Sequence, residues 1–389
     1  MKRRTRVLFL TLITALFMSG CANGEQSEKE EGKEPPKQSE TTEKEDTKIS
    51  LAAVGDNLIH GAIYLSSDYQ VNGSYDFTSI YAQLKSFLVD YDIANINQET
   101  VLGGTQLGLS HYPSFNSPQE IGDAIADAGF NWVSQASNHS LDAGAAGIIS
   151  AMDFWDRYPD VVTTGINRSE EEAARPRIME VKGVKVGLLN YSYGFNGYVE
   201  PEDFYCNEID KAKIKKDYEQ LKEAGCIVVL ASMHWGQEYQ FSSNEEQREL
   251  AQFLADLGVN VIIGAHPHVV QETTFLTGKN GNQTLVNYSL GNILSAQDEN
   301  YTMLGALMTC EIVIDGNSNE VTIEQAKVYP TVNYYEAYGG SWHNFQIYLL
   351  RDYNDTLAST HAVANTTVAY LNDLCDQVYG EVKDIEIVR

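Results

Sequence analysis

The sequence predicts an α/β fold, a layered sandwich in which mixed β-sheets are flanked by helices. The first observation is that β-rich runs alternate with helical stretches from residue 49 to residue 265. The second is that polar and histidine residues follow the ends of several predicted strands. The third is a change after residue 285 to strands that follow one another without helices. Residues 49–389 are therefore expected to form one domain.

The expected elements follow from local composition and from hydrophobic spacing. Runs of Val, Ile and Leu are typical of buried parallel strands, expected at residues 48–55, 92–97, 132–136, 161–165, 184–191, 227–233 and 259–264. Apolar residues at helical spacing predict helices between them, at residues 79–90, 119–128, 143–157, 209–224 and 245–257. The later part predicts strands 304–314, 320–329 and 344–350 and a last helix 357–378. This second set is expected to form or extend another sheet packed on the first.

Residues 1–20 have the pattern of an export signal. Basic residues at positions 2, 3, 4 and 6 precede an apolar run, 7–18, that is too short to span a bilayer. Met18-Ser19-Gly20-Cys21 resembles a bacterial lipobox. Cys21 is therefore predicted to carry a lipid as the first residue of the mature protein, with plain secretion as the alternative.

The segment after Cys21 is predicted to be a disordered tether. Residues 22–48 are polar, contain Pro35-Pro36 and hold no large apolar residue, so they cannot bury enough surface to fold. The chain is thus divided into a signal peptide (1–20), a lipidated tether (21–48) and a folded domain. We expect an exported bacterial cell membrane lipoprotein that faces outward and contacts the membrane through its lipid anchor only.

The chain is strongly acidic, with 27 Lys and Arg against 54 Asp and Glu and a formal net charge of −27. The basic signal and the acidic tether cancel, so the excess lies in the folded body. Nucleic acid is excluded as a general partner, because such partners need a basic face. An anionic group on a substrate would have to meet a local positive centre, such as a bound metal.

The number and spacing of the cysteines argue against a thiolate metal site. There are five, an odd number, and none has the C-x-x-C spacing of zinc ribbons and redox motifs. Cysteines in apolar surroundings, such as Cys226 and Cys310, are expected to be small buried residues.

Polar motifs follow five of the predicted strands. They are Gly55-Asp56-x-x-x-His60, Asn97-x-Glu99, Asn138-His139-x-x-Asp142, His234-Trp235-Gly236-x-Glu238 and Gly264-Ala265-His266-Pro267-His268. Ligand sites in open α/β sheets gather at the carboxyl ends of strands. Imidazole, carboxylate and amide groups together suit Mn, Zn or Fe.

Single residues of these motifs also have other interpretations. His234 alone is equally typical of a packed histidine, and Asp56 alone of a turn or helix cap. Gly55 and Gly264 are expected to let the chain turn sharply off a strand. Pro267 is expected to fix the backbone between two imidazoles.

In this order the five motifs resemble the CapA family of capsule or poly-γ-glutamate synthesis proteins, which is itself similar to the calcineurin-like metallophosphoesterases. The resemblance implies a metallophosphoesterase-like layered sandwich and a divalent metal site with two ions. Its ligands would be Asp56, His60, Glu99, Asn138, His234, His266 and His268. Two of these ligand positions depart from the pattern, and Ser137 replaces the usual Gly before Asn138. His60 follows Asp56 by four residues instead of two, and Glu99 stands where the wider family has Asp.

The resemblance also implies a hydrolase. His139 would protonate the leaving group, and Asp142 would orient its imidazole; a helix N-terminal acid is the other interpretation of Asp142. Trp235 and Glu238 would form the substrate rim, although Trp235 also suits packing and Glu238 a partner of a metal-binding histidine.

The sequence therefore predicts a surface protein acting in synthesis, transfer or release of an extracellular anionic polymer such as poly-γ-glutamate. Expected partners are the polymer or its precursor and capsule-synthesis membrane proteins. The alternative is a non-catalytic accessory or polymer-binding lipoprotein with a degenerate metal site. Residues 334–343 suit strand packing or glycan binding, Arg175 and Arg177 could meet an anion, and His111 and His361 are expected at the surface.

Overall fold

The computed structural model describes residues 44–389. The predictions on the export signal, on Cys21 and on all but the last residues of the tether lie outside the described residues. The helices are α1 (Gly61–Leu65), α2 (Ala82–Leu88), α3 (Glu120–Asp127), α4 (Gly144–Trp155), α5 (Glu170–Ala174), α6 (Lys211–Glu223), α7 (Glu245–Leu257), α8 (Asp355–Thr360) and α9 (Val368–Tyr379).

The first sheet combines parallel and antiparallel strands. Its order is β16 (Ser341–Leu349), β15 (Val321–Tyr338), β14 (Leu304–Ile314), β1 (Thr47–Asn57), β4 (Ile93–Gln98), β5 (Trp132–Ser134) and β6 (Val162–Thr164). Strands β1, β4, β5 and β6 run parallel, whereas β14, β15 and β16 pair antiparallel. Two short strands join this sheet at the side of β1 and β15, namely β13 (Asn292–Leu294) and β17 (Glu386–Ile387).

The second sheet is built from the middle of the chain. Its order is β11 (Thr273–Thr277), β12 (Gln283–Asn287), β10 (Val261–Ala265), β9 (Val228–His234), β8 (Val184–Ser192) and β7 (Ile178–Val181). The four inner strands are parallel, and β7 and β11 are antiparallel edges. A separate hairpin pairs β2 (Gln70–Val71) with β3 (Ser74–Tyr75).

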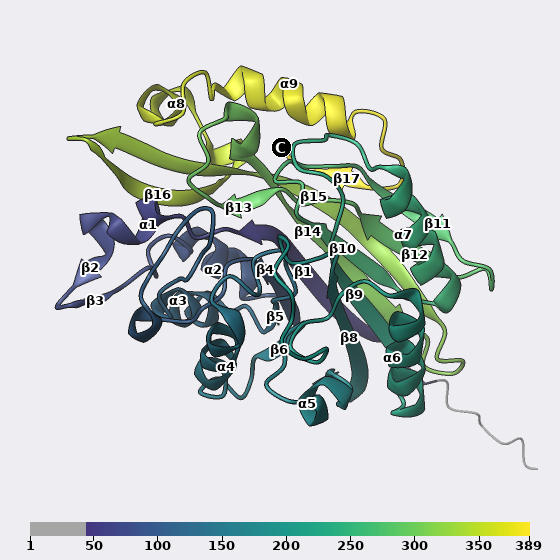
Figure 1. Cartoon of the computed structure of the whole chain (residues 1–389). Helices are drawn as coiled ribbons and strands as arrows, with labels where there is room; N and C mark the ends of the chain where they lie inside the picture. Colours follow the sequence, from purple (N-terminus) through teal and green to yellow (C-terminus); the bar gives the residue numbers. More distant parts are fainter. Residues whose placement is uncertain (1–43) are drawn as a thin grey trace, which may run out of the picture. The chain divides into compact units, whose positions relative to one another are not determined.

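The two sheets pack face to face through apolar side chains. Leu51 and Ala53 of β1 share one buried cluster with Leu230 of β9 and Ile263 of β10, and α9 packs into the same cluster through Leu371. The other face of the first sheet is covered by α1 to α4, and the other face of the second by α6 and α7 (Figure 1). The predicted layered α/β sandwich is confirmed.

The prediction for the end of the chain is wrong in two respects. Strands β14 to β16 do not form another sheet, because β14 pairs with β1 along residues 47–54 and so extends the first sheet. The predicted last helix is two helices, because Asn354 caps α8 and Thr367 caps a new start at α9. His361, between them, is buried and not at the surface, and its Nε2 lies 3.0 Å from the Asn333 carbonyl oxygen.

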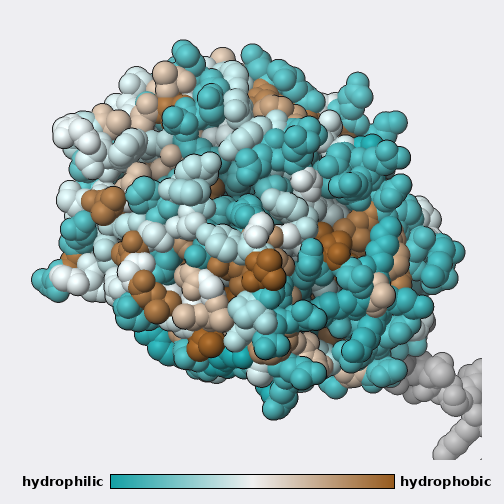
Figure 2. All heavy atoms as spheres, in the orientation of Figure 1, coloured by the Kyte–Doolittle hydropathy of each residue, from teal (hydrophilic) through white to brown (hydrophobic). Residues whose placement is uncertain are grey.

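The surface is mostly hydrophilic, and the cysteines are buried, as the sequence predicts. Hydrophilic side chains cover most of the face in Figure 2, and hydrophobic ones occur in small groups. Within residues 44–389, no helix has the length and apolar character needed to cross a membrane. All cysteines of this part of the chain, Cys206, Cys226, Cys310 and Cys375, are buried and unpaired, as expected for small core residues.

Candidate metal centre

Five of the seven predicted ligands come together where strands of both sheets end. Asp56 lies at the end of β1 and Glu99 directly follows β4, both in the first sheet. His234 ends β9, and His266 and His268 follow β10 in the second sheet. The parallel pairing of β9 with β10 sets His234 opposite Ala265, beside the two later histidines. The site is therefore assembled across the interface of the two sheets.

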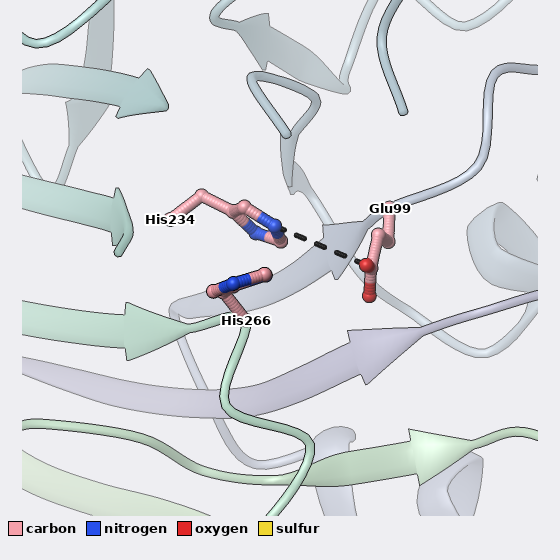
Figure 3. Close-up of side chains that lie close together, drawn as sticks. All are labelled: Glu99, His234 and His266. Atoms are coloured by element: carbon pink, nitrogen blue, oxygen red, sulfur yellow. Dashed lines mark ion pairs between the residues drawn. The ribbon is translucent and has the colours of Figure 1, made fainter. Parts of the chain in front are cut away.

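Glu99 is at the middle of this group. Its Oε1 lies 3.9 Å from His234 Nε2 and 3.7 Å from His268 Nε2. Figure 3 shows the rings of His234 and His266 close together beside the Glu99 carboxylate. One atom each of Glu99, His234 and His266 lie within 4.8 Å of one another, as do single atoms of Asp56, Glu99 and His268.

Several buried atoms of the group lack a partner. Neither carboxylate oxygen of Glu99 has a hydrogen bond within residues 44–389, and the same is true of His266 Nδ1. Glu99, His234 and His266 are at most 3% exposed. An unpaired buried carboxylate is costly, and it faces nitrogen atoms that are metal ligands in proteins. The residues present therefore fit a divalent cation.

Asp56 and Asn138 support the same group. The Asp56 carboxylate accepts hydrogen bonds from Asn97 Nδ2 at 2.9 Å and from the His266 backbone N–H at 3.1 Å. Its Oδ2 also lies 3.1 Å from His268 Nδ1. Asn138 Oδ1 lies 2.9 Å from His234 Nε2. Five of the seven predicted ligands, Asp56, Glu99, His234, His266 and His268, thus share candidate metal groups, and Asn138 contacts one of them.

The three buried histidines of the candidate metal groups differ in the direction of their pKa shifts. Burial lowers the pKa of His234 and of His266, so both rings are neutral. Burial also opposes the charge on His268, but the Glu99 and Asp56 carboxylates outweigh it and raise its pKa to about 9. Burial raises the pKa of Glu99, and the Asp56 charge adds to this effect. Without a cation, His268 therefore supplies the positive charge of the site.

This charge predicts a pH-dependent affinity for metal. Because His268 is protonated below pH 9, a cation that uses this ring must displace a proton. The affinity for Mn²⁺ should therefore rise by about tenfold per pH unit between pH 7 and pH 8. Calorimetric titration in two buffers of different ionisation enthalpy measures the released proton. In the variant His343→Gln, whose histidine pairs with Asp68 outside the site, the same dependence is expected. A pH-independent affinity would contradict the assignment.

His139 forms a second, adjoining arrangement with Asp142. Its Nδ1 lies 2.7 Å from Asp142 Oδ2, which also accepts the Phe115 backbone N–H at 2.6 Å. The Phe115 ring meets His139 edge-on, with the centroids 4.7 Å apart. Since Nδ1 is held by Asp142, Nε2 is the nitrogen available for proton transfer.

Asn196, which stands in none of the five sequence motifs, connects the two arrangements. Asn196 follows β8, accepts a hydrogen bond from Asn138 Nδ2 at 3.2 Å, and places its own Nδ2 3.3 Å from His139 Nδ1. A single asparagine in a loop has no spacing that would have revealed this role.

His60 and Trp235 do not take the places in the site that were predicted for them, whereas Glu238, predicted at the substrate rim, belongs to a candidate metal group. His60 is outside all the candidate metal groups of residues 44–389: its Nδ1 accepts the Ala296 backbone N–H at 3.2 Å, and burial lowers its pKa to about 4. Its four-residue spacing carries it beyond the strand to the start of α1. Trp235 is 2% exposed and donates to the Tyr288 carbonyl, so it packs in the core and does not form a rim. Glu238 is exposed and belongs to a candidate group with His266 and His268.

The glycines act differently from the prediction. Neither Gly55 nor Gly264 has a positive φ; the turn falls on His266 and His268, with φ of 98° and 58°. Such angles are uncommon for non-glycine residues and concentrate at functional sites. Gly55 and Gly264 are needed for close backbone approach, since an added Cβ would lie 1.9 Å from Gly291 O and 2.0 Å from Tyr288 O, respectively.

The variant Gly264→Ala is expected to destabilise the fold. Its Cβ would overlap a buried carbonyl of the chain that leads out of β12, so the free energy of unfolding should fall by about 3 kcal/mol or more. Urea denaturation of the metal-free protein measures this loss. Gly281→Ala is the matched control: its φ is 84° and the space around it is open, so about 1 kcal/mol is expected. Equal losses in the two variants would contradict the overlap.

Comparisons with known proteins give a family match and several more distant similarities. The family described as bacterial capsule synthesis protein PGA_cap matches residues 50–297. The PGA biosynthesis protein CapA of Bacillus subtilis (strain 168) is 30% identical over 209 residues, 51% of this chain and 51% of that protein. The capsule biosynthesis protein CapA of Bacillus anthracis is 27% identical over 214 residues, 52% of this chain and 49% of that protein. The match thus spans about half the length of these curated relatives.

Solved structures with a similar chain path include two bacterial proteins. The NAD nucleotidase of Haemophilus influenzae has a TM-score of 0.46 and 12% identity, over 88% of this chain and 57% of that one. The calcineurin-like phosphoesterase YfkN of Bacillus subtilis has a TM-score of 0.43 and 13% identity, over 86% of this chain and 99% of that one. Similarities at this level carry no argument about chemistry.

Proposed function

Because the chain belongs to the PGA_cap family of bacterial capsule synthesis proteins, we propose that it is a metal-dependent hydrolase acting on an extracellular anionic polymer such as poly-γ-glutamate, or on its precursor. It would serve in the synthesis, transfer or release of that polymer. The observation that carries the hydrolase assignment is the buried Glu99 carboxylate: neither oxygen has a hydrogen bond within residues 44–389, and Oε1 lies near the nitrogens of His234 and His268.

In this proposal, different residues bind the metal, position the backbone and transfer the proton. The residues that would hold divalent metal are Asp56, Glu99, His234, His266 and His268. When bound, the metal supplies Lewis-acid catalysis and positive charge for an anionic group. Asp56 keeps the turn in place through the His266 backbone N–H. His139, with Nδ1 held by Asp142, would pass a proton from Nε2 to the leaving group.

We also propose a place for the protein in the cell. It would be exported and held on the outer side of the bacterial membrane by a lipid on Cys21, and its partners would include capsule-synthesis membrane proteins. The lipobox-like sequence before Cys21 supports this proposal. Metabolic labelling with a fatty acid tests it: the full chain should be labelled, and Cys21→Ser should not.

One observation favours a second candidate, a non-catalytic accessory protein that holds the polymer. His60 is separated from the other predicted ligands, so the set is one histidine short of the family pattern. Binding of poly-γ-glutamate that persists in Asp56→Ala and in the presence of chelator would favour this candidate over the hydrolase.

Elemental analysis of the full chain, purified without chelator, tests the metal-dependent proposal. At least one equivalent of a transition metal is expected. Less than about half an equivalent, unchanged after adding Mn or Zn, would overturn it. Activity is then sought on phosphodiesters, phosphomonoesters and γ-glutamyl peptides with Mn, Zn and Fe. Turnover that disappears with chelator and returns with metal would separate the hydrolase from the accessory protein.

A further inference from the structure

Asn292 lies beside Asp56 although the two residues are far apart in the sequence. Strand β13 pairs parallel with the end of β1, and this register sets Asn292 directly opposite Asp56. Both side chains are 0% exposed. No sequence motif marks Asn292, and the proposed function does not use it.

The orientation of the Asn292 amide is fixed by its neighbours. Its Nδ2 donates to Gln297 Oε1 at 2.7 Å and to the Thr302 carbonyl at 3.3 Å. Both partners are acceptors, so they must face the amino group of the amide and not its oxygen. Asn292 Oδ1 is thereby turned toward the metal centre.

Three ligand-type atoms meet at this point. His268 Nδ1 lies 3.1 Å from Asp56 Oδ2 and 3.1 Å from Asn292 Oδ1. A single N–H on Nδ1 cannot point at both oxygens at once. Ligand atoms about 2.1 Å from one cation are separated by about 3.0 Å in octahedral and about 3.4 Å in tetrahedral geometry. The two observed spacings, from His268 Nδ1 to each oxygen, match those of neighbouring ligands of one ion.

We propose that Asn292 Oδ1 is a metal ligand. With Asp56 Oδ2 and His268 Nδ1 it forms one cation position, next to the position formed by Glu99, His234 and His266. Asn292 thereby supplies the contact that His60 does not make. This inference rests on the proposed function in one respect, namely that the site binds divalent cations.

Metal titration of the full chain tests the proposal. Metal-free protein is titrated with Mn²⁺, and bound and free Mn²⁺ are counted by electron paramagnetic resonance. The wild type should bind two ions. Asn292→Ala should lose at least about tenfold in affinity at one position and keep the other. Asn287→Ala, which also removes a buried amide but contacts Thr273 outside the site, controls for general destabilisation and should bind both ions normally.

A second measurement identifies the nitrogen that binds metal. In ¹⁵N-histidine spectra of the Zn²⁺-loaded protein, with His268 assigned by His268→Gln, Nδ1 should show the shift of a coordinated nitrogen. A protonated Nδ1 with a coordinated Nε2 would overturn the proposal, because Asn292 would then only position the ring. Unchanged Mn²⁺ binding in Asn292→Ala would overturn it as well, while leaving the proposed function intact. A wild type that binds no metal would overturn both.

Discussion

Glu99→Gln is expected to lower the affinity for Mn²⁺ by more than about 100-fold, because it removes the carboxylate shared by two candidate metal groups. Partners of metal ligands typically contribute 10–100-fold, roughly, and a shared ligand should exceed that range. Glutamine keeps the size of the side chain but has one amide oxygen in place of a charged carboxylate. Equilibrium dialysis followed by elemental analysis measures the loss.

The same variant has a second expected effect, of opposite sign. Burial raises the pKa of Glu99 in the folded state, so the stability that its protonated form contributes is lost as the pH rises through that pKa. At neutral pH the metal-free Glu99→Gln should therefore unfold at a temperature no lower than the wild type, although its stabilisation by Mn²⁺ disappears. Glu272→Gln, whose carboxylate accepts hydrogen bonds from Ser243 outside the site, should keep normal Mn²⁺ binding. Wild-type affinity in Glu99→Gln would contradict the assignment of the site.

His139→Ala is expected to lower turnover by about 10²- to 10⁴-fold while leaving metal content unchanged. The imidazole adjoins the candidate metal groups without belonging to them, and its Nδ1 is bound to Asp142. Turnover is measured on the substrate identified in the screen, and metal by elemental analysis of the same preparation.

Asp142→Asn separates the role of His139 from that of its partner. The amide can still contact the ring but no longer stabilises the imidazolium, so a smaller fall of about 10- to 100-fold is expected. His343→Gln, outside the site, should keep full activity. Equal turnover in His139→Ala and the wild type would rule out the proton donor, and loss of metal in that variant would assign it to the metal group instead.

The sequence predicted the positions of the site residues better than their contacts. Asp56, Glu99 and His266 stand at the ends of hydrophobic runs, and such runs identify parallel strands whose ends meet. The error on His60 has a long-range cause: spacing along the chain cannot show that its imidazole accepts the backbone N–H of Ala296, 236 residues away. The rim prediction for Trp235 fails for the same reason, since its indole N–H donates to the carbonyl of Tyr288, 53 residues away.

Pairing between strands that are far apart in the sequence explains the remaining differences between the predicted and the observed fold. That β14 joins β1, and that β13 brings Asn292 to Asp56, depends on contacts between residues 236 to 267 positions apart, which local propensity does not encode. The strands expected between residues 48 and 264 divide into two sheets after β6. Nothing in the strand sequences themselves marks that division.

The origin of the ligands in two different sheets has a consequence for the folded state as a whole. Asp56 and Glu99 come from one sheet, and His234 and His266 from the other, so a bound ion would join the two halves of the sandwich as a cross-link does. At 100 times the dissociation constant, binding adds about 2.7 kcal/mol to the free energy of unfolding. Amide hydrogens at the ends of β1 and β9 should then exchange more slowly with solvent, and the metal would act as a structural clamp as well as a cofactor.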